Sequence, residues 1–359
     1  MIITELETLL STATDFKEKR NYWLVRTQGG LYYEHFKAGN FIAIGFNEIN
    51  LVDIYESKKD EKEPLKLLTE TIKNRRPEDT KPRYAANQLL KFSYEIKKGD
   101  IIIIPSESSF KVSIGEVQSS LVEIVENPKR PINLSQDEET CPFQKQKKVR
   151  WFKEIKRTKL PPSLFKLLFS HHIITEATDY ANSVDTLLSD FYVKGDNVVL
   201  VLEVATQDDI NARTLFGMGC ELLDLVDDFC NYYNLGINTD DVEVKIGLQS
   251  QGKIQLSTKT KSVGLITGLL VIGIVGGGFK VQTESFTLDL STQGLIQKVE
   301  EYLDHKHQRE VKQQLLDKHM KSLQIQKPED LIRVIEATTT IGNQLPKQNV
   351  NNSDSTSTQ

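Results

Sequence analysis

The sequence predicts an α+β protein with two folded units, a small curled β-barrel with helices followed by an α/β unit that carries a glycine-rich apolar segment. Its 359 residues suffice for two or three domains that each bury a core. Short apolar runs typical of strands alternate with helix-like spacings in both halves. One run, VGLITGLLVIGIVGGGF at 263–279, has no charged side chain in an otherwise hydrophilic chain. These three observations define the fold class.

Composition narrows the partners and the compartment. A net charge of -5 argues against wholesale coating of nucleic acid but is compatible with a local basic face. The three cysteines, Cys141, Cys220 and Cys230, have neither metal-ligand spacing nor an even number for disulfides, which is typical of a reducing compartment. Residues 1–20 lack the apolar centre of a signal peptide and favour an amphipathic helix. We therefore expect a cytoplasmic protein, associated with the inner membrane through the apolar run.

Residues 21–126 are expected to form the first unit. Apolar runs predict strands at 21–27, 41–46, 101–105 and 110–118, and amphipathic spacing predicts a helix at 84–96. Turn residues such as Gly29-Gly30 and the SESS stretch at 106–109 separate these elements. Strands around one or two helices in so short a segment predict the small curled barrel.

Residues 127–162 are expected to form a basic connector. Between Lys145 and Lys159, eight basic residues accompany a single acid, Glu154. Basic side chains that contact nucleic-acid phosphates gain affinity by releasing counterions. The phosphate-contact candidates are Lys147, Lys148, Arg150, Lys153, Lys156 and Arg157. A solvated linker and a patch that faces anionic lipid are the alternatives.

Residues 163–330 are expected to form the second unit. Strands are predicted at 197–204, 242–248 and 280–290, and helices at about 208–233 and 292–323. The final stretch, 331–359, is expected to be mostly disordered because its last residues have too little apolar content to fold.

The apolar run at 263–279 has three interpretations. A helix of this length reaches about 25 Å, the short end of a membrane span. Gly264, Gly268, Gly273 and Gly277 form two G-x-x-x-G pairs, the spacing that lets helices approach closely in lipid. This membrane interpretation is the preferred one. A pair of buried strands, which the many β-branched residues suit, and a homo-oligomer seam in water are the alternatives.

Five segments of the chain resemble a known family. They are YWLVRTQGG, FIAIGF, YAANQLLKFSYEIKKGDIIIIP, VSIGEV and VRWFKEI. In this order and spacing, over about residues 21–157, they resemble the PUA-like, EVE-related module that precedes the nuclease of Mrr-type modification-dependent restriction endonucleases. The resemblance implies a barrel that takes one base of a nucleic acid, often a modified base, into an aromatic-walled pocket. Phe46 stands where that family usually has Trp, and Asn87 and Leu90 also depart from its pattern.

Carried over by position, the resemblance assigns six base-pocket candidates. They are Trp23, Arg26, Phe46, Gln88, Ser106 and Phe110. Such a pocket needs flat apolar walls that stack on the base and polar groups that bond its edge. An aromatic residue on a barrel strand is also typical of a core, so this alternative stays open for Trp23 and Phe46.

No catalytic device is predicted. In the restriction enzymes that the chain resembles, acidic residues near a lysine hold Mg²⁺ in a PD-(D/E)xK pattern. The nearest fragment here is Asp196 with Glu203, and Ala205 takes the place of the lysine. Walker, Rossmann, nucleophile-elbow and metal-ligand motifs are missing from the sequence as well. The sequence therefore predicts no enzyme, no cofactor and no metal.

Three hypotheses follow from these patterns. The leading one is a prokaryotic antiviral defence protein whose first unit senses nucleic acid or a modified nucleotide and whose second unit acts at, or is anchored to, the inner membrane. The second is a soluble, non-catalytic nucleic-acid-binding module that recruits a separate nuclease. The third is an enzyme with a degenerate metal site around Asp196 and Glu203.

Overall fold

The computed structural model describes residues 2–59, 63–123, 130–248, 252–276, 290–304 and 310–342. It confirms a mixed α+β protein with a curled, half-barrel sheet. Two compact units divide the chain, and they are called here the internal unit (residues 19–188) and the terminal unit (residues 1–18 and 189–359). The expected boundaries at 20/21, 126/127 and 162/163 therefore differ from those of the structure.

The internal unit is built on one sheet. Its strands are β2 (Tyr22–Val25), β3 (Phe41–Ile44), β4 (Ile101–Pro105), β5 (Lys111–Val117), β6 (Val122–Glu123), β7 (Lys145–Lys156) and β8 (Ile174–Glu176). Their order is β3-β7-β5-β4-β2-β8, and β6 pairs with β7. Strands β2 and β4 run parallel, whereas the other pairs are antiparallel. A register shift at Ile114 and Gly115 marks a bulge between β5 and β7, which bends the sheet.

Helices cover both faces of this sheet. They are α2 (Tyr33–Ala38), α3 (Leu51–Lys59), α4 (Pro64–Arg75), α5 (Pro82–Leu90), α6 (Ser163–Leu168) and α7 (Ala181–Leu188). Trp23 and Ile102 pack in one core with residues of α2 to α5, and Tyr22 and Ile101 pack in another with residues of α6 and α7. Burial on both faces explains why the IIIIP strand is apolar throughout.

The prediction of a basic connector at 127–162 is wrong for residues 145–156, which include most of its basic side chains. Residues 145–156 form β7, a twelve-residue strand between β3 and β5. Lys145, Gln146, Lys147 and Val149 are buried, while Lys148 and Arg150 are exposed. Polar and basic side chains thus occupy buried positions of the strand, so a hydropathy pattern does not reveal it.

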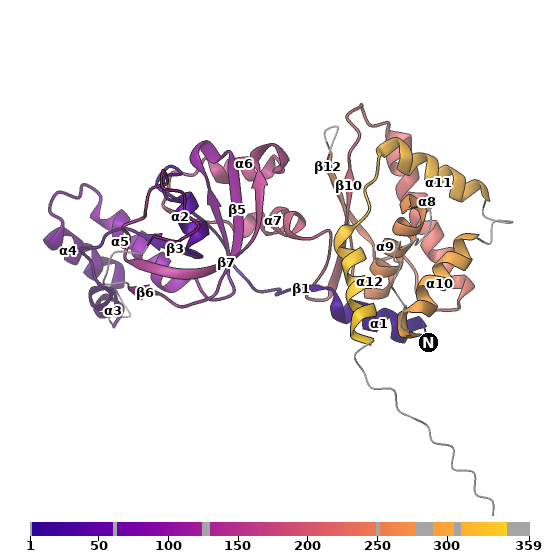
Figure 1. Cartoon of the computed structure of the whole chain (residues 1–359), viewed down its shortest axis with the longest axis horizontal. Coiled ribbons are helices and arrows are strands. Elements are labelled where there is room, and N and C mark those ends of the chain that lie inside the picture. Colours follow the sequence, from indigo (N-terminus) through magenta and orange to yellow (C-terminus); the bar gives the residue numbers. More distant parts are fainter. Residues whose placement is uncertain are drawn as a thin grey trace, which may run out of the picture. The chain divides into compact units, whose positions relative to one another are not determined.

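The terminal unit pairs a five-stranded sheet with a layer of helices. Its strands are β1 (Thr14–Phe16), β9 (Phe191–Lys194), β10 (Asn197–Val204), β11 (Glu243–Leu248) and β12 (Gly252–Thr258), in the order β1-β9-β10-β12-β11. Its helices are α1 (Ile2–Thr12), α8 (Ala212–Tyr232), α9 (Lys261–Gly276), α10 (Leu290–Asp304), α11 (Glu310–Leu323) and α12 (Glu329–Gly342). In Figure 1, helices α8, α9, α10 and α11 lie to the right of β10 and β12, and α1 and α12 contribute residues to the same core.

Both ends of the described chain belong to the terminal unit. Helix α1, expected as a separate N-terminal piece, buries Leu6 and Leu9 in the core of this unit. The disorder expected from residue 331 onward is wrong up to residue 342, because α12 places Leu331, Val334 and Ile335 in the same core at helical spacing. The rest of the predicted tail lies outside the described residues.

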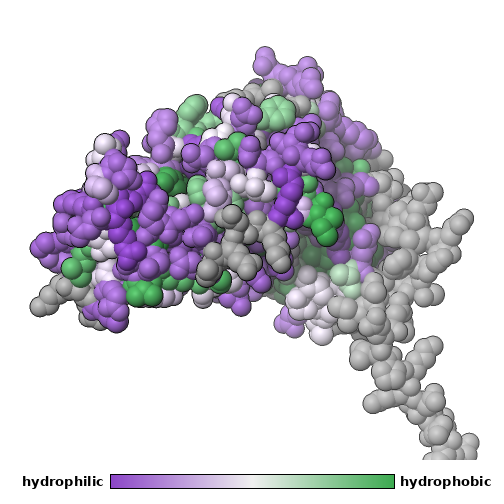
Figure 2. Space-filling view, turned by 60° about the vertical axis from the view of Figure 1, so that its left-hand side comes forward, coloured by the Kyte–Doolittle hydropathy of each residue, from purple (hydrophilic) through white to green (hydrophobic). Residues whose placement is uncertain are grey.

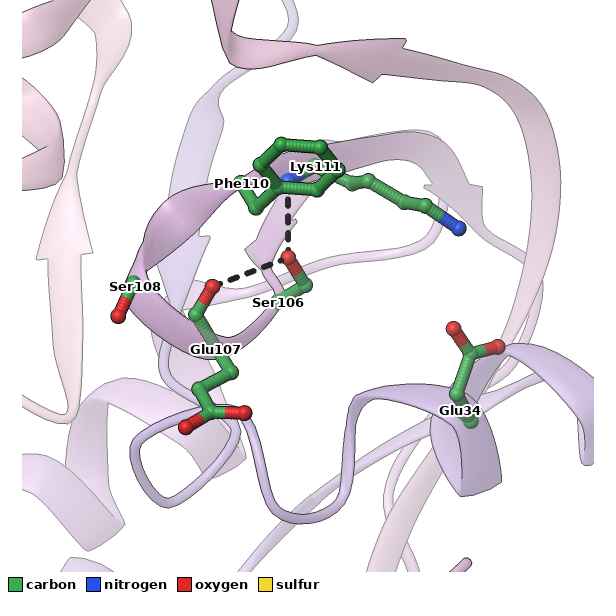
Figure 3. A pocket seen from close by; sticks show the side chains of 6 residues that line it. All are labelled: Glu34, Ser106, Glu107, Ser108, Phe110 and Lys111. Atoms are coloured by element: carbon green, nitrogen blue, oxygen red, sulfur yellow. Dashed lines mark hydrogen bonds between the residues drawn. The ribbon is translucent and has the colours of Figure 1, made fainter.

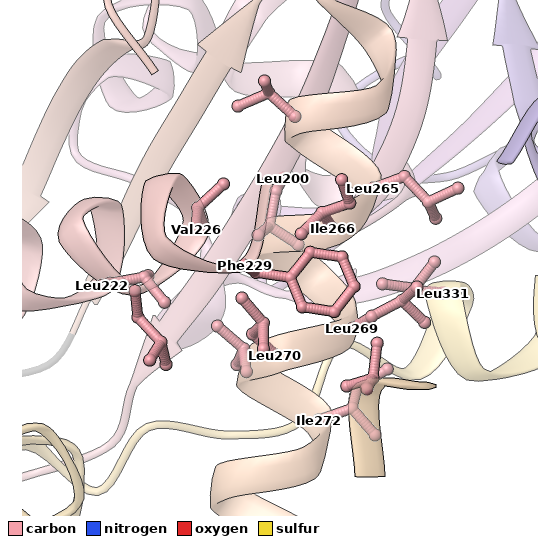
Figure 4. Packing of buried hydrophobic residues seen from close by; sticks show 14 of the residues in the cluster. Leu200, Leu222, Val226, Phe229, Leu265, Ile266, Leu269, Leu270, Ile272 and Leu331 are labelled. Carbon is pink, nitrogen blue, oxygen red and sulfur yellow. The ribbon is translucent and has the colours of Figure 1, made fainter. Parts of the chain in front are cut away.

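The apolar run is a core helix rather than a pair of strands. Helix α9 buries Val263, Leu265, Ile266, Leu269 and Leu270 completely, against residues of β10, α8 and α12 (Figure 4). Among the described residues, no helix is both long and apolar enough to cross a membrane. On the face shown in Figure 2, the coloured residues are mostly hydrophilic and the apolar ones form small separate groups.

The glycines of α9 permit close packing inside one chain. A Cβ at Gly264 would lie 2.7 Å from Val198 Cγ1, and a Cβ at Gly268 would lie 2.3 Å from Leu331 Cδ2. The G-x-x-x-G spacing therefore brings α9 against β10 and α12, instead of against lipid or a second copy. Gly273 is buried too, and Gly277 lies outside the described residues, as does most of the strand predicted at 280–290.

Candidate functional site

A pocket of about 390 Å³ lies between α2 and the connection from β4 to β5. Its lining residues are Glu34, Ser106, Glu107, Ser108, Phe110 and Lys111. Figure 3 shows Glu34 on α2 across from the segment that carries the other five residues. The pocket therefore joins two elements that are distant in sequence.

The loop from Ser106 to Phe110 is held in an uncommon conformation. Ser108 and Ser109 both have positive φ angles, 50° and 53°, which non-glycine residues seldom adopt. Ser106 Oγ accepts a hydrogen bond of 2.8 Å from the backbone N–H of Lys111, as Figure 3 shows. Thr27 Oγ1 donates a hydrogen bond of 2.6 Å to the Pro105 carbonyl. Backbone of this kind is often found at ligand sites, where the surrounding structure holds it in place.

Gly30 lies against the backbone of the same loop. Its φ of +108° and its approach to Glu107 both exclude a side chain, because a Cβ there would lie 2.2 Å from the Glu107 backbone nitrogen. The backbone of Gly30 thus packs directly on the pocket loop.

Phe110 is an exposed aromatic side chain on a fixed backbone. Its side chain is 62% exposed. The Phe110 carbonyl accepts a hydrogen bond of 2.9 Å from the Arg157 backbone N–H. The Arg157 guanidinium donates one of 3.1 Å to the Ser108 carbonyl. A large flat apolar ring is therefore presented to solvent at the pocket without the freedom of a loose loop.

A charged network borders the pocket. Glu154 on β7 accepts hydrogen bonds from Lys37 and from the Tyr33 hydroxyl (3.0 Å), and forms an ion pair of 3.2 Å with Lys111. Partial burial opposes the ionisation of Glu154, but the bonds from Lys37, Lys111 and Tyr33 outweigh it and lower its pKa. Burial raises the pKa of Tyr33, so its hydroxyl stays protonated and can donate. The network holds Lys111 in place beside the two pocket carboxylates, Glu34 and Glu107.

Of the six base-pocket candidates, Ser106 and Phe110 meet at the pocket. Trp23 and Gln88 lie in the core instead, at 3% and 2% exposure. Trp23 Nε1 donates a hydrogen bond of 3.0 Å to Asp100, and Gln88 Oε1 accepts one of 2.7 Å from the Ile174 backbone. Trp23 on β2 and Gln88 on α5 are therefore packed inside the fold and do not line the pocket.

Arg26 and Phe46 do not line the pocket either. The Arg26 guanidinium donates hydrogen bonds to the carbonyls of Leu168 and Ser170, and burial lowers its pKa. Phe46 has a φ of 64°. The guanidinium carbon of Arg76 lies over the Phe46 ring, 5.2 Å from the ring centroid. Arg26 therefore ties β2 to the end of α6, and Phe46 forms a separate cation–π contact.

The six phosphate-contact candidates divide into two groups. Lys147 is buried, donates to the Ile96 carbonyl at 2.8 Å, and has its pKa lowered by burial to about 8. Lys153 donates to the Leu187 carbonyl and Arg157 to the pocket loop, so both serve the fold. The other three, Lys148, Arg150 and Lys156, are exposed, and Lys153 is exposed as well.

An exposed aromatic residue accompanies those three basic residues. The Arg150 guanidinium lies 5.0 Å from the ring centroid of Phe152, which is 43% exposed, and pairs with Glu116 at 2.9 Å. The outward side of β7 thus carries both positive charge and a flat apolar ring. This is the combination that single-stranded nucleic acids bind.

Glu34, Glu107, Lys111 and Phe152 are residues that the sequence reasoning missed. Lys111 adjoins the predicted Phe110, and Phe152 lies within the predicted basic segment, so both had a local signal. Glu34 had none, because it reaches the pocket only through the packing of α2 beside the β4–β5 connection.

A metal centre finds no support in the described part of the chain. No group of three His, Cys, Asp or Glu side chains there has the geometry to hold a metal ion. Asp196 precedes β10 and Glu203 lies near its far end, which puts them about 23 Å apart along the strand. The two carboxylates of the degenerate-enzyme hypothesis therefore do not meet.

Comparison with known proteins assigns no activity. Residues 23–167 match a family model described as a domain of unknown function (DUF8426). No curated protein matches the chain. The matched residues lie within the internal unit and include the whole pocket.

Proposed function

We propose that the internal unit is a PUA-like, EVE-related module that binds nucleic acid and takes one base into the pocket at Phe110. The observation that carries the proposal is an exposed ring on a fixed loop beside two carboxylates. Base stacking on an aromatic side chain contributes roughly 1–3 kcal/mol, and every base has a flat face for it. The five sequence segments that resemble the family support the same function independently.

The pocket chemistry favours bases that carry an amino group. A carboxylate accepts hydrogen bonds, and the exocyclic amino group of cytosine or adenine donates them. Glu34 and Glu107 supply such acceptors, and Lys111 supplies one donor for a ring carbonyl. Uracil and thymine present no exocyclic amino group. Two carboxylates also repel phosphate, so a base rather than the backbone occupies this site.

The backbone of the nucleic acid then follows β7. Lys148, Arg150 and Lys156 are exposed cations of this strand, besides Lys153, which is exposed and bonded to the Leu187 carbonyl, and Phe152 offers a second stacking surface. Only a few phosphates are neutralised by three cations, which agrees with a chain of net charge -5 that does not coat nucleic acid.

We further propose a defence role in which this module recruits a nuclease that is a separate protein. This proposal rests on the family resemblance and on the lack of a metal cluster among the described residues. The membrane-anchored version loses its main support, because the apolar run is a core helix. The terminal unit is then the part that contacts other proteins.

Binding of the full chain to short labelled oligonucleotides tests the base-binding function. The panel contains one variable base, either cytosine, 5-methylcytosine, adenine, N6-methyladenine or uracil, in otherwise identical single strands and duplexes. Fluorescence anisotropy at fixed salt should rank cytosine and adenine, or their modified forms, above uracil by at least about tenfold. Equal affinity for all members, or no binding to any, would contradict the proposal.

A further inference from the structure

Strand β11 is an open edge of the terminal sheet. It pairs with β12 on one side and stands at the end of the strand order, with no partner on its other side among the described residues. Residues 243–247 are all exposed, and Val244 and Ile246 are 55% and 45% exposed. An edge strand that presents free backbone groups and apolar side chains is a template for another strand.

The apolar side chains of β11 lie in line with buried apolar side chains of β12 and β10. Val244 pairs with Leu256 and Ile246 with Ile254 on β12, and these pair in turn with Leu200 and Leu202 on β10. Residues directly opposite in a ladder point to the same face. Val244 and Ile246 therefore extend the helix-covered apolar face of the sheet, although they remain open to solvent.

Several devices that protect an edge strand are missing from β11, although it carries an exposed lysine, Lys245. It contains no proline, its pairing with β12 shows no register shift, and no charge points to its apolar face. Its two charges, Glu243 and Lys245, lie on the opposite face and are two residues apart. Because of this spacing, each charge can face the opposite charge when two copies of the strand pair antiparallel.

We infer that two copies of the chain associate by antiparallel pairing of their β11 edges about a two-fold axis at Val244. In this register Val244 faces Val244 of the second copy, and each Glu243 faces the other Lys245. Both charged pairs are attractive, and the apolar row runs unbroken from one sheet into the other. The register one step along, centred on Lys245, would oppose two like charges. The occupant that this edge fits is therefore a second copy of the same chain.

The expected dimer is weak, because one strand edge is a small interface. Sedimentation of the full chain over about 1–200 μM should show a mass that rises from 40.8 kDa toward twice that value. A single mass of 40.8 kDa over this whole range would overturn the inference.

Charge exchange identifies the register. Lys245→Glu gives each strand two acids, and Glu243→Lys gives each two lysines, so either variant alone should raise the dimer Kd by about tenfold or more. An equimolar mixture of the two should associate again, because each Glu then faces a Lys. Association of the mixture also proves that both variants are folded. If both variants dimerise as well as the wild type, and mixing changes nothing, the inference fails.

Cysteine cross-linking separates this register from its neighbours. In a Cys220→Ala background, Val244→Cys should form an intermolecular disulfide under mild oxidation, because the two Cα atoms lie about 5 Å apart in a directly opposed pair. Ile246→Cys should not, because the two copies of residue 246 are separated by about 14 Å along the strands. The reverse result would contradict the register. Self-association that these variants leave unchanged would mean that the two copies meet through a different surface, and it would overturn the inference.

Discussion

Phe110 shows how one residue carries the functional argument. Its ring is 62% exposed, yet its carbonyl and that of Ser108 are both bound by Arg157. A fixed backbone reduces the entropy that is lost when a ligand binds to the exposed ring. Arg157 was predicted to bind phosphate, and its hydrogen bonds to this loop make it a positioning residue instead.

The pocket carboxylates set the choice of base at the residue scale. Glu34→Gln combined with Glu107→Gln replaces two acceptors by groups that both donate and accept, at almost unchanged volume. We expect the preference for cytosine over uracil to fall by about tenfold, while overall binding persists through stacking. Anisotropy titrations with the two oligonucleotides measure this ratio. An unchanged ratio would mean that neither carboxylate contacts the base.

Trp23 separates a core role from a pocket role. Trp23→Phe keeps a buried ring but removes the hydrogen bond from Nε1 to Asp100. The loss of a bond to a charged group should lower the free energy of unfolding by about 1.5–3 kcal/mol and leave oligonucleotide affinity unchanged. Urea unfolding and anisotropy measure the two quantities. Weaker oligonucleotide binding with unchanged stability would indicate that Trp23 lines the pocket.

The site residues were predictable from the sequence only where the resemblance supplied them. It named Ser106 and Phe110, which lie together in the pocket. It also named Trp23, Gln88 and Arg26, whose polar atoms are used by the fold. Residue type cannot distinguish these two uses, because an aromatic ring or an amide is suited to both. Only the position of a strand within the sheet decides between them.

At the scale of elements, helix α9 explains the apolar run through its neighbours. Its glycines face Val198 and Leu331, where a side chain has no room. Gly264→Ala gains about 1 kcal/mol of helix propensity but forces a methyl group against a stiff β-branched neighbour, so the free energy of unfolding should fall by about 1–2 kcal/mol. Urea unfolding measures it.

Gly219 provides the matched control for that substitution. It lies on α8, and a Cβ added to it would have no atom within 4 Å. Gly219→Ala should therefore raise the free energy of unfolding by about 1 kcal/mol. If both alanine variants are equally stabilised, α9 is not packed as the structure has it.

The start of β9 and the N-terminus of α12 share a pH-dependent contact. Asp190 accepts hydrogen bonds of 3.0 and 3.3 Å from the Asp330 backbone N–H. Burial and, after it, the negative charge of Asp330 raise the pKa of Asp190 to about 6, against the opposing effect of backbone N–H groups. The folded state therefore binds a proton at Asp190 more tightly than the unfolded state does.

This linkage predicts how the stability contribution of Asp190 changes with pH. The raised pKa makes the contribution of Asp190 to stability highest below about pH 4 and lets it fall as the pH rises to about 6, beyond which it is constant. Asp190→Asn removes the titration and keeps an acceptor. Between pH 4 and 6.5, the free energy of unfolding of the variant should therefore rise by about 2–3 kcal/mol relative to that of the wild type. Urea unfolding measures this change. A difference that is constant with pH would contradict this account.

Most elements were predictable, and the exceptions share one cause. The strands at 41–44, 101–105 and 197–204 and the helix at 212–232 have clear periods. Strand β7 was missed because Lys145 and Lys147 occupy buried positions, and α12 because polar residues surround its apolar stripe. The run at 263–279 is equally compatible by composition with lipid and with a protein core. Its surroundings, which the sequence does not specify locally, decide the matter.

At the scale of the whole molecule, the internal unit is an insertion within the terminal unit. Strand β1 ends at Phe16 and pairs in parallel with β9, which begins at Phe191, so the inserted residues leave and return at neighbouring strands. Insertions are tolerated where the ends of a domain lie close together. The sequence suggested two consecutive units because a pairing between strands so far apart leaves no local pattern.

Salt dependence reports on the whole nucleic-acid surface. The three cations assigned to phosphate contact on β7, Lys148, Arg150 and Lys156, should give a slope of about -2 in a plot of log K against log salt concentration for single strands. Replacing Lys148, Arg150 and Lys156 by Gln should bring the slope close to zero and weaken binding to all oligonucleotides alike. A slope that survives this triple substitution would place the phosphates elsewhere.

The central claim is that Phe110 stacks on a base, and one comparison tests it most directly. Phe110 and Phe216 are both 62% exposed, but Phe216 lies on α8 in the terminal unit and does not line the pocket. The affinity of the full-length Phe110→Ala variant for a cytosine oligonucleotide should be about 5- to 150-fold lower than that of Phe216→Ala, which should bind as the wild type does. Equal affinities for the two variants would contradict the account.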